Sequence, residues 1–247
     1  MKFLIQTIDK KIEHDFAFTL LKSIDFKNWL NRNDVNNKTY YRFFDTGVDQ
    51  KEFVFKSFHH TYVPIGSVEF VLAFLQQFHN TTLKPINVPI ELLNERFSLR
   101  KIFNGTEKDL KGKMFVKSND KIKNICGIFN EDELHELPKG NYQFSEVISI
   151  DSEWRAFVYN RKLVGLQNYL GEFTKFPNAD AIKEMIDEYE LAPIAYTLDV
   201  GVNDSGTFII ECHEFFSCGL YSFNSPYYPN MLYRAFKEII NKILAEI

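Results

Sequence analysis

The sequence has few cysteines and no long apolar run. These two features disfavour a disulfide-rich secreted protein and a membrane-spanning protein. It holds three cysteines in 247 residues, an odd number without the spacing of a disulfide framework. This usage favours a reducing compartment. The sequence contains no stretch of about 18 apolar residues, the length that a membrane-spanning helix needs. The first residues also lack the apolar core of a signal peptide. We therefore expect a cytoplasmic protein without a membrane span.

The sequence also lacks a basic tail or stripe. Its formal net charge is −4, which disfavours nucleic acid as the main partner. The glycine patterns of a Walker A loop and of a Rossmann fold are missing, and no Ser-His-Asp or Cys-His arrangement can be assigned. What is present is a hydrophobic content of 45%, with 25 Phe and 12 Tyr. These numbers predict a globular protein with a well-filled core, as one large domain or two small ones.

The first eighty residues alternate between expected strands and helices. The pattern predicts strands at Lys2–Gln6 and Glu52–Phe58, a helix around Phe16 to Ile24, and a second helix with Ser67 as its N-cap. This alternation indicates a small α/β domain. Two prolines in the segment Leu83–Pro89 disfavour both a helix and a central strand. We therefore place a domain boundary there, between residues 1–82 and residues 83–247.

The second domain is richer in strands. The runs KMFVKS and YQFSEVISI predict two strands, and a hairpin follows that turns near Asn160-Arg161. Ala181–Tyr189 is expected to be a helix, and the chain closes with a helix whose apolar stripe extends from Met231 to Leu244. The pattern is that of an α+β protein.

One expected hairpin places two carboxylates opposite each other. A three-residue loop at Asp204-Ser205-Gly206 pairs Asn203 with Thr207 and, further along the strands, Asp199 with Glu211. Like charges directly opposite destabilise a sheet. A divalent cation would remove the conflict, and carboxylate oxygens suit Mg²⁺. The alternative is a solvated acidic hairpin without a metal.

Other residues would suit a nucleotide site. Lys117 ends a short apolar strand, where it can reach a phosphate or simply extend its amine into water. Glu153 and Arg155 share a strand face, as a structural ion pair or as contacts for a ribose and a phosphate. The extended backbone of Gln143–Ile148 can offer a donor and an acceptor to an adenine edge.

A zinc site is disfavoured. Cys212 and His213 are adjacent and point to opposite faces of a strand. Cys218 lies close in sequence, but a fourth ligand is not evident, whereas structural zinc usually takes four.

The order of these motifs resembles the ATP-grasp superfamily, and most closely its small stand-alone members from phages and bacteria. The matching segments are FVKS, SEWR, LDVGV and IIECHEFFSCGLY, between about Arg100 and Tyr221. Four motifs in order are far more specific than any one of them. The resemblance implies an α+β fold in which two α+β subdomains sandwich ATP, preceded by a small α/β domain.

The resemblance also implies roles for single residues. Lys117 would contact ATP phosphates together with Lys101, for which Arg100 is the rival. Glu153 would lie near the ribose, and the adenine hinge would be formed by Glu146, Val147 and Ile148. The residues that would hold Mg²⁺ are Asp199, Glu211 and, at the third position, His213. Ser217 and Gly219 would line the substrate pocket.

Three positions depart from the superfamily pattern. His213 stands where an Asn is usual, and Thr197 stands where many members carry an Arg. Arg155 is then the expected substitute, as a catalytic group that binds substrate and stabilises charge together with Lys117. The loop at Ser118–Lys121 lacks the usual glycines. These departures put the rate and identity of the chemistry in question.

The implied reaction joins a small-molecule or peptide carboxylate to an amine, through an acyl phosphate, with release of ADP and phosphate. Two alternatives stay open. A metal-dependent nuclease would use the hairpin of Asp199 and Glu211, with His213 in place of a lysine. A nucleotide-binding module without catalysis would bind ATP without turnover. Neither the substrates nor the oligomeric state follows from the sequence.

Overall fold

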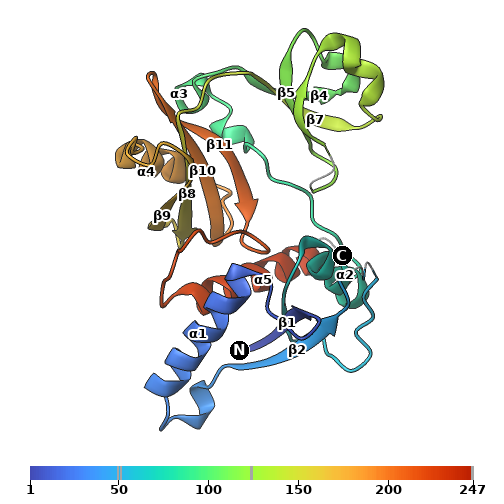
Figure 1. Cartoon of the computed structure of the whole chain (residues 1–247), viewed down its shortest axis with the longest axis vertical. Coiled ribbons are helices and arrows are strands. Elements are labelled where there is room, and N and C mark those ends of the chain that lie inside the picture. The colour runs from blue at the N-terminus through green and yellow to red at the C-terminus, as the bar shows by residue number, and fades with distance from the viewer. Residues whose placement is uncertain (49, 51, 123–124, 246–247) are drawn as a thin grey trace. The chain divides into compact units, whose positions relative to one another are not determined.

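The computed structural model describes residues 1–48, 50, 52–122 and 125–245 (Figure 1). The chain forms two compact units. The first contains Met1–Thr82, Pro193–Ala195 and the segment from Phe215 onward, and the second contains Leu83–Ala192 and Tyr196–Glu214. The first unit thus ends its initial segment where the sequence predicts a boundary, but it also takes in the C-terminal segment. That the first unit is a separate domain preceding the ATP-grasp domain stays a prediction.

The first unit is a small α/β fold. Its three-stranded sheet has the order β2-β1-β3, with β1 parallel to both neighbours. The strands are β1 (Lys2–Ile8), β2 (Tyr40–Thr46) and β3 (Val63–Ile65), and the helices are α1 (Asp15–Leu30), α2 (Val68–His79) and α5 (Tyr228–Ala245). The C-terminal helix α5 belongs here because its apolar stripe packs on α1, α2 and β3; for example, the rings of Phe74 and Phe236 lie 6.2 Å apart. The side chains of Ile243 and Leu244 lie outside the described residues.

Two local predictions for this unit can be checked. Ser67 is the N-cap of α2, since its hydroxyl accepts a hydrogen bond from the amide of Phe70, and this prediction is confirmed. The predicted strand at Glu52–Phe58 is wrong: these described residues form turns and irregular backbone. Phe55 is nonetheless buried against Phe70 and Phe74. The aromatic side chains of this segment fill a core without pairing its backbone, so the apolar pattern was misleading.

The second unit contains two four-stranded sheets (Figure 1). One has the order β4-β7-β5-β6, and we call it the lysine sheet: β4 (Ile102–Thr106), β5 (Met114–Ser118), β6 (Cys126–Phe129) and β7 (Asn141–Glu146). The other has the order β11-β10-β8-β9, and we call it the carboxylate sheet: β8 (Ser152–Tyr159), β9 (Lys162–Gly171), β10 (Ala195–Asn203) and β11 (Gly206–Glu214). Helices α3 (Glu95–Ser98) and α4 (Ala179–Glu188) complete the unit.

Each sheet has its own apolar core. Helix α4 packs on the carboxylate sheet, where Ile182, Met185 and Ile186 are buried with residues of β8, β10 and β11. The lysine sheet has a smaller core that includes Val116 and Phe144. The β8–β9 hairpin turns at Asn160 and Arg161 as predicted, and both have positive φ, the backbone shape of a tight two-residue turn. Among the helices that the described residues form, none is long and apolar enough to cross a membrane.

Candidate functional site

The β10–β11 hairpin brings together the two carboxylates that the sequence pairs. Asp199 lies opposite Glu211, as predicted. The predicted turn is nevertheless wrong, because Asn203 pairs with Gly206 rather than with Thr207. The register shifts between Asp199 and Val200, as in a β-bulge, and this shift restores the predicted pair. The glycine at 206 has a φ of +129°, which a residue with a side chain rarely adopts.

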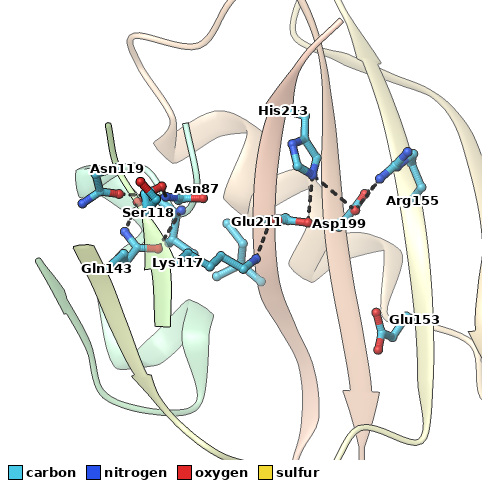
Figure 2. A network of polar contacts seen from close by, with 12 residues as sticks. Asn87, Lys117, Ser118, Asn119, Gln143, Glu153, Arg155, Asp199, Glu211 and His213 are labelled. Carbon is cyan, nitrogen blue, oxygen red and sulfur yellow. Dashed lines mark hydrogen bonds and ion pairs between the residues drawn. The ribbon is translucent and has the colours of Figure 1, made fainter. Parts of the chain in front are cut away.

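The carboxylate of Asp199 is buried and bound by Arg155. The Arg155 Nε donates to Oδ1 at 2.8 Å and Nη2 donates to Oδ2 at 2.7 Å, so the guanidinium binds both oxygens (Figure 2). Asp199 is 1% exposed and Arg155 is 7% exposed. A buried carboxylate is costly unless it is paired and hydrogen-bonded, and this two-pronged contact satisfies it. The geometry makes Arg155 a partner of Asp199 in the structure, rather than a partner of Glu153 on its own strand.

Glu211 lies between two basic side chains. Lys117 of the lysine sheet pairs with Oε2, and the Nε2 of His213 lies 2.8 Å from Oε1 (Figure 2). Burial by itself raises the pKa of Glu211, but the hydrogen bond and charge of His213, together with the charge of Lys117, outweigh burial and hold the pKa well below its usual range. Glu211 is therefore a carboxylate at neutral pH.

Asp199, Glu211 and His213 form a cluster with the composition of a cation site. One ligand atom from each lies within 4.8 Å of the others. His213 Nε2 is also 3.9 Å from the nearer Asp199 oxygen. The two carboxylates supply hard oxygen atoms, which fit Mg²⁺, while an imidazole suits it less well. In this structure Arg155 pairs with Asp199 and Lys117 pairs with Glu211, so each carboxylate has a positively charged partner.

The structure separates the two candidates for a second basic contact. Arg100 is tied down, since its Nη1 donates to the carbonyls of Ser98 at 2.9 Å and Ile209 at 2.8 Å. Burial lowers the pKa of Arg100 to about 10. Lys101 is exposed and its Nζ lies 5.8 Å from the ring centroid of Phe103. Lys101 is therefore the more exposed of the two, and its contact with a phosphate stays a prediction.

The predicted adenine hinge follows the end of β7. The Glu146 amide donates to the Lys101 carbonyl at 3.1 Å, and the Lys101 amide donates to the Glu146 carboxylate at 2.9 Å. Val147 and Ile148 come directly after the strand, and Val147 is exposed. The Glu146 side chain thus holds Lys101, the residue before β4, and the contact of Glu146, Val147 and Ile148 with an adenine stays a prediction.

Glu153 is held by a residue that sequence reasoning missed. The hydroxyl of Tyr169 on β9 donates to Glu153 Oε2 at 2.7 Å, and the guanidinium carbon of Arg155 lies 5.7 Å from the same ring. Burial, the negative charge of Asp199 and the hydrogen bond to Glu153 raise the pKa of Tyr169. Tyr169 therefore stays neutral and donates. The strand pattern of β9 carried no signal that singled it out.

Asn87 is a second residue that sequence reasoning missed. It lies in the segment Leu83–Pro89, which the sequence marks only as a boundary, yet it is 5% exposed and contacts both sheets. Figure 2 shows it beside Ser118 and Asn119 of the lysine sheet. Ser217 and Gly219, predicted to line a substrate pocket, belong to the first unit. There the Ser217 hydroxyl donates to the carbonyl of Gly66 at 2.7 Å. Their role toward a substrate stays a prediction.

Comparisons with known proteins agree with the resemblance found in the sequence. A family model described as ATP-grasp domain, R2K clade family 2, matches residues 97–231. A comparison with curated proteins finds no match. Among solved structures, D-cycloserine synthetase DcsG is similar with a TM-score of 0.53 and 10% identity, covering 97% of this chain and 100% of that one.

Two further structures are similar over nearly the whole chain. A RimK domain protein ATP-grasp from Sphaerobacter thermophilus has a TM-score of 0.50 and 13% identity, covering 99% of this chain and 100% of that one. The D-alanine–D-alanine ligase from Bacillus anthracis complexed with ATP has a TM-score of 0.50 and 13% identity, covering 99% and 97%. At such identities the likeness concerns the fold, and it confirms the fold that the order of motifs predicts.

Proposed function

The chain belongs to the ATP-grasp domain family 2 of the R2K clade, and from this premise we propose that it is an ATP- and Mg²⁺-dependent ligase that joins a carboxylate to an amine. The observation that carries the proposal is the convergence of Lys117 with Glu211, Asp199 and His213. A lysine from one sheet and two carboxylates from the other meet there, and we assign them to a phosphate and to a cation. This is the pair of functions that a nucleotide triphosphate with its cation requires.

The residues fit the cation that the family implies. Asp199 and Glu211 would hold Mg²⁺, with His213 as a third ligand or as the residue that orients a water ligand. When bound, the ion would neutralise charge on the phosphate oxygens. Lys117 and Lys101 would bind the phosphates, and Lys117 would leave Glu211 to do so. Arg155 holds both oxygens of Asp199 in place through two hydrogen bonds.

The proposed chemistry needs no protein nucleophile. A substrate carboxylate oxygen attacks the γ-phosphorus of ATP, the bond to the β-phosphate oxygen breaks, and ADP and an acyl phosphate result. The amine then attacks the acyl carbon, phosphate leaves, the new C–N bond forms and the amine loses a proton. Lys117 stabilises the charge of the transferring phosphoryl group electrostatically. Arg155 contributes through Asp199.

The substrate class is a small molecule or a peptide. Similar structures are named as a D-alanine–D-alanine ligase and a D-cycloserine synthetase, which supports small acid and amine substrates by analogy of fold alone. Glu146, Val147, Ile148 and Glu153 would contact the nucleoside, and Ser217 and Gly219 the acceptor. We place the reaction in the cytoplasm of a bacterium or a phage-infected cell.

A second candidate is a module that binds ATP without turnover. The specific observation in its favour is that both oxygens of Asp199 are bound by Arg155, while His213 occupies the position of a third oxygen ligand. The nuclease alternative gains no support from the family match.

Thermal unfolding with ligands tests the proposal. We would compare the shift in midpoint caused by Mg²⁺, ATP, ADP, GTP and Mg-ATP for the wild type, Asp199→Asn and Lys117→Ala, with the exposed Lys183→Ala as the control. A ligand at 100 times its Kd stabilises by about 2.7 kcal/mol. We expect Mg-ATP to shift the wild type and Lys183→Ala, and to shift the two site variants far less.

The other outcomes separate the alternatives. A shift by Mg²⁺ alone, with no addition by ATP, would remove the basis of the ligase and favour nuclease assays. Binding of Mg-ATP without release of ADP across a panel of acids and amines would favour the module that binds without turnover.

A further inference from the structure

We propose that Asn87 is a positioning residue that fixes the lysine sheet against the carboxylate sheet, so that Lys117 and Glu211 meet. The geometry of this contact stands by itself, while its consequence for nucleotide binding rests on the proposed function. Asn87 lies in the connecting segment Leu83–Pro89, which precedes both sheets in the chain. Its backbone contacts the carboxylate sheet. Its side chain contacts the lysine sheet beside Ser118 and Asn119 (Figure 2).

The backbone of Asn87 binds the strand that carries Glu211. The amide of Cys212 donates to the Asn87 carbonyl at 2.7 Å, and the two residues form an antiparallel bridge. Cys212 is fully buried and stands between Glu211 and His213 in the chain. A displacement of Asn87 would therefore also displace the part of β11 that carries Glu211 and His213, the candidate metal ligands.

The side chain of Asn87 binds the strand that carries Lys117. Its Nδ2 donates to the Ser118 carbonyl at 3.0 Å and to the Asn119 side-chain oxygen at 2.7 Å. Ser118 directly follows Lys117. Both protons of the amide are used in a buried setting, where an unpaired polar group is costly. One residue thus links the neighbour of Lys117 to the neighbour of Glu211.

A second contact next to Asn87 strengthens the link to the lysine sheet. The Gln143 side chain accepts from the Val88 amide and donates to the Val88 carbonyl, both at 2.9 Å. Gln143 lies opposite Lys117 in the β5–β7 register. Asn104 accepts hydrogen bonds from both Gln143 and Asn119, which closes the network on the lysine sheet.

The residue type fits this role. Asn87 has a φ of +53°, in the left-handed region that asparagine and glycine tolerate best. Glycine would keep the backbone bridge to Cys212 but remove both side-chain hydrogen bonds. Asn87→Gly is therefore the variant that cuts the link to the lysine sheet alone. Asn80, with a φ of +48° at the exposed end of α2 in the first unit, offers Asn80→Gly as a matched control.

The amine reactivity of Lys117 tests the link without any nucleotide. Lys117 is protected by its pairing with Glu211 and is 12% exposed. Labelling with an amine reagent, followed by mass spectrometry, would give its rate relative to Lys175, which pairs at 2.7 Å with Asp151, the residue before β8. We expect Asn87→Gly to raise this ratio roughly three- to tenfold, as loss of one or two hydrogen bonds implies. Asn80→Gly should leave it unchanged.

Affinities for Mg-ATP and adenosine then show whether Asn87 positions the two sheets or only stabilises the fold. Mg-ATP would span both sheets, whereas adenosine reaches neither Lys117 nor Glu211 in the proposed site. We expect Asn87→Gly to weaken Mg-ATP binding while adenosine binding stays unchanged. An unchanged Lys117 ratio, or an equal loss of affinity for both ligands, would overturn the inference. Failure of the wild type to bind Mg-ATP would refute the proposed ligase, while the labelling result would still decide whether Asn87 links the sheets.

Discussion

The two sheets of the second unit differ in how their charged side chains are buried and paired. The carboxylate sheet contains a buried ion pair formed within the sheet, between Arg155 on β8 and Asp199 on β10. At the lysine sheet, Lys101 is exposed directly before β4, and the largely covered Lys117 pairs with Glu211 of the other sheet. A buried pair gains rigidity from packing around it, whereas a long lysine side chain keeps its freedom to move.

This difference suits a site that must hold a cation and release a product. A metal ligand has to stay fixed, because small displacements weaken coordination, and Asp199 is fixed by two hydrogen bonds from one guanidinium. A phosphate contact has to exchange partners during each cycle. Lys117 would give up Glu211 for a phosphate and return afterwards. In the proposed site, the carboxylate sheet would thus hold Asp199 in one position, and the lysine sheet would supply a side chain that changes partners.

The largest expected effect comes from breaking the buried pair. Arg155→Met leaves the carboxylate of Asp199 buried without its main partner, which should cost about 3–5 kcal/mol in the free energy of unfolding. Urea unfolding at pH 7 would measure it. The control is Arg96→Met, which removes an exposed pair with Glu184 and should cost less than about 1 kcal/mol. If both variants lose the same small amount, the carboxylate sheet does not depend on its buried pair.

The pH dependence of stability tests the contact between the sheets. The pKa of Glu211 is lowered in the folded protein, because the basic groups around it outweigh burial. Its contribution is therefore present above the unfolded value of about 4.3 and is lost as the pH falls below that value. We expect Glu211→Gln to be less stable than the wild type by about 1–3 kcal/mol at pH 7, and this gap to shrink between pH 5 and pH 3.

The control for this experiment is Glu184→Gln, at an exposed ion pair in the same unit. Its gap from the wild type should stay small at every pH. A gap for Glu211→Gln that is equally large at pH 3 and pH 7 would contradict the idea that charge pairing stabilises Glu211.

Local sequence patterns predicted the strands that carry the site. They did not predict the order in which distant strands pair in the sheets. The pairing of Asp199 with Glu211 follows from one hairpin, although the turn was misplaced by one residue and the irregular register corrected it. The pairing of Arg155 with Asp199 depends on β8 lying next to β10, a neighbour relation that alternation along one strand does not encode.

The role of Asn87 was hidden for a similar reason. The prolines around it correctly disfavour regular structure, but they say nothing of which strands an irregular segment contacts. The segment Glu52–Phe58 shows the converse error, since its aromatic residues suit a strand and fill a core as a loop. The apolar pattern of a segment indicates which side chains are buried. In this segment a side chain is buried although the backbone does not pair in a sheet.

The smallest expected change in stability comes from Lys101, which is exposed. Its substitution tests most directly whether a residue can serve binding without serving the fold. Lys101→Met removes a charge whose side chain is exposed, so the free energy of unfolding should change by less than about 0.5 kcal/mol. In the proposed site the same change removes a phosphate contact, and the Kd for Mg-ATP should rise roughly tenfold, since a charge-assisted hydrogen bond contributes about 1.5–3 kcal/mol.

Arg100→Met provides the matched contrast one residue away. Its guanidinium donates to the carbonyls of Ser98 and Ile209, so its loss should destabilise the fold by about 1–3 kcal/mol. Calorimetric titration with Mg-ATP and urea unfolding of both variants would separate the two roles. If instead Arg100→Met abolishes nucleotide binding with little loss of stability, and Lys101→Met leaves the Kd unchanged, then the phosphate contact belongs to Arg100. The phosphate contact would then come from a half-buried guanidinium instead of an exposed lysine.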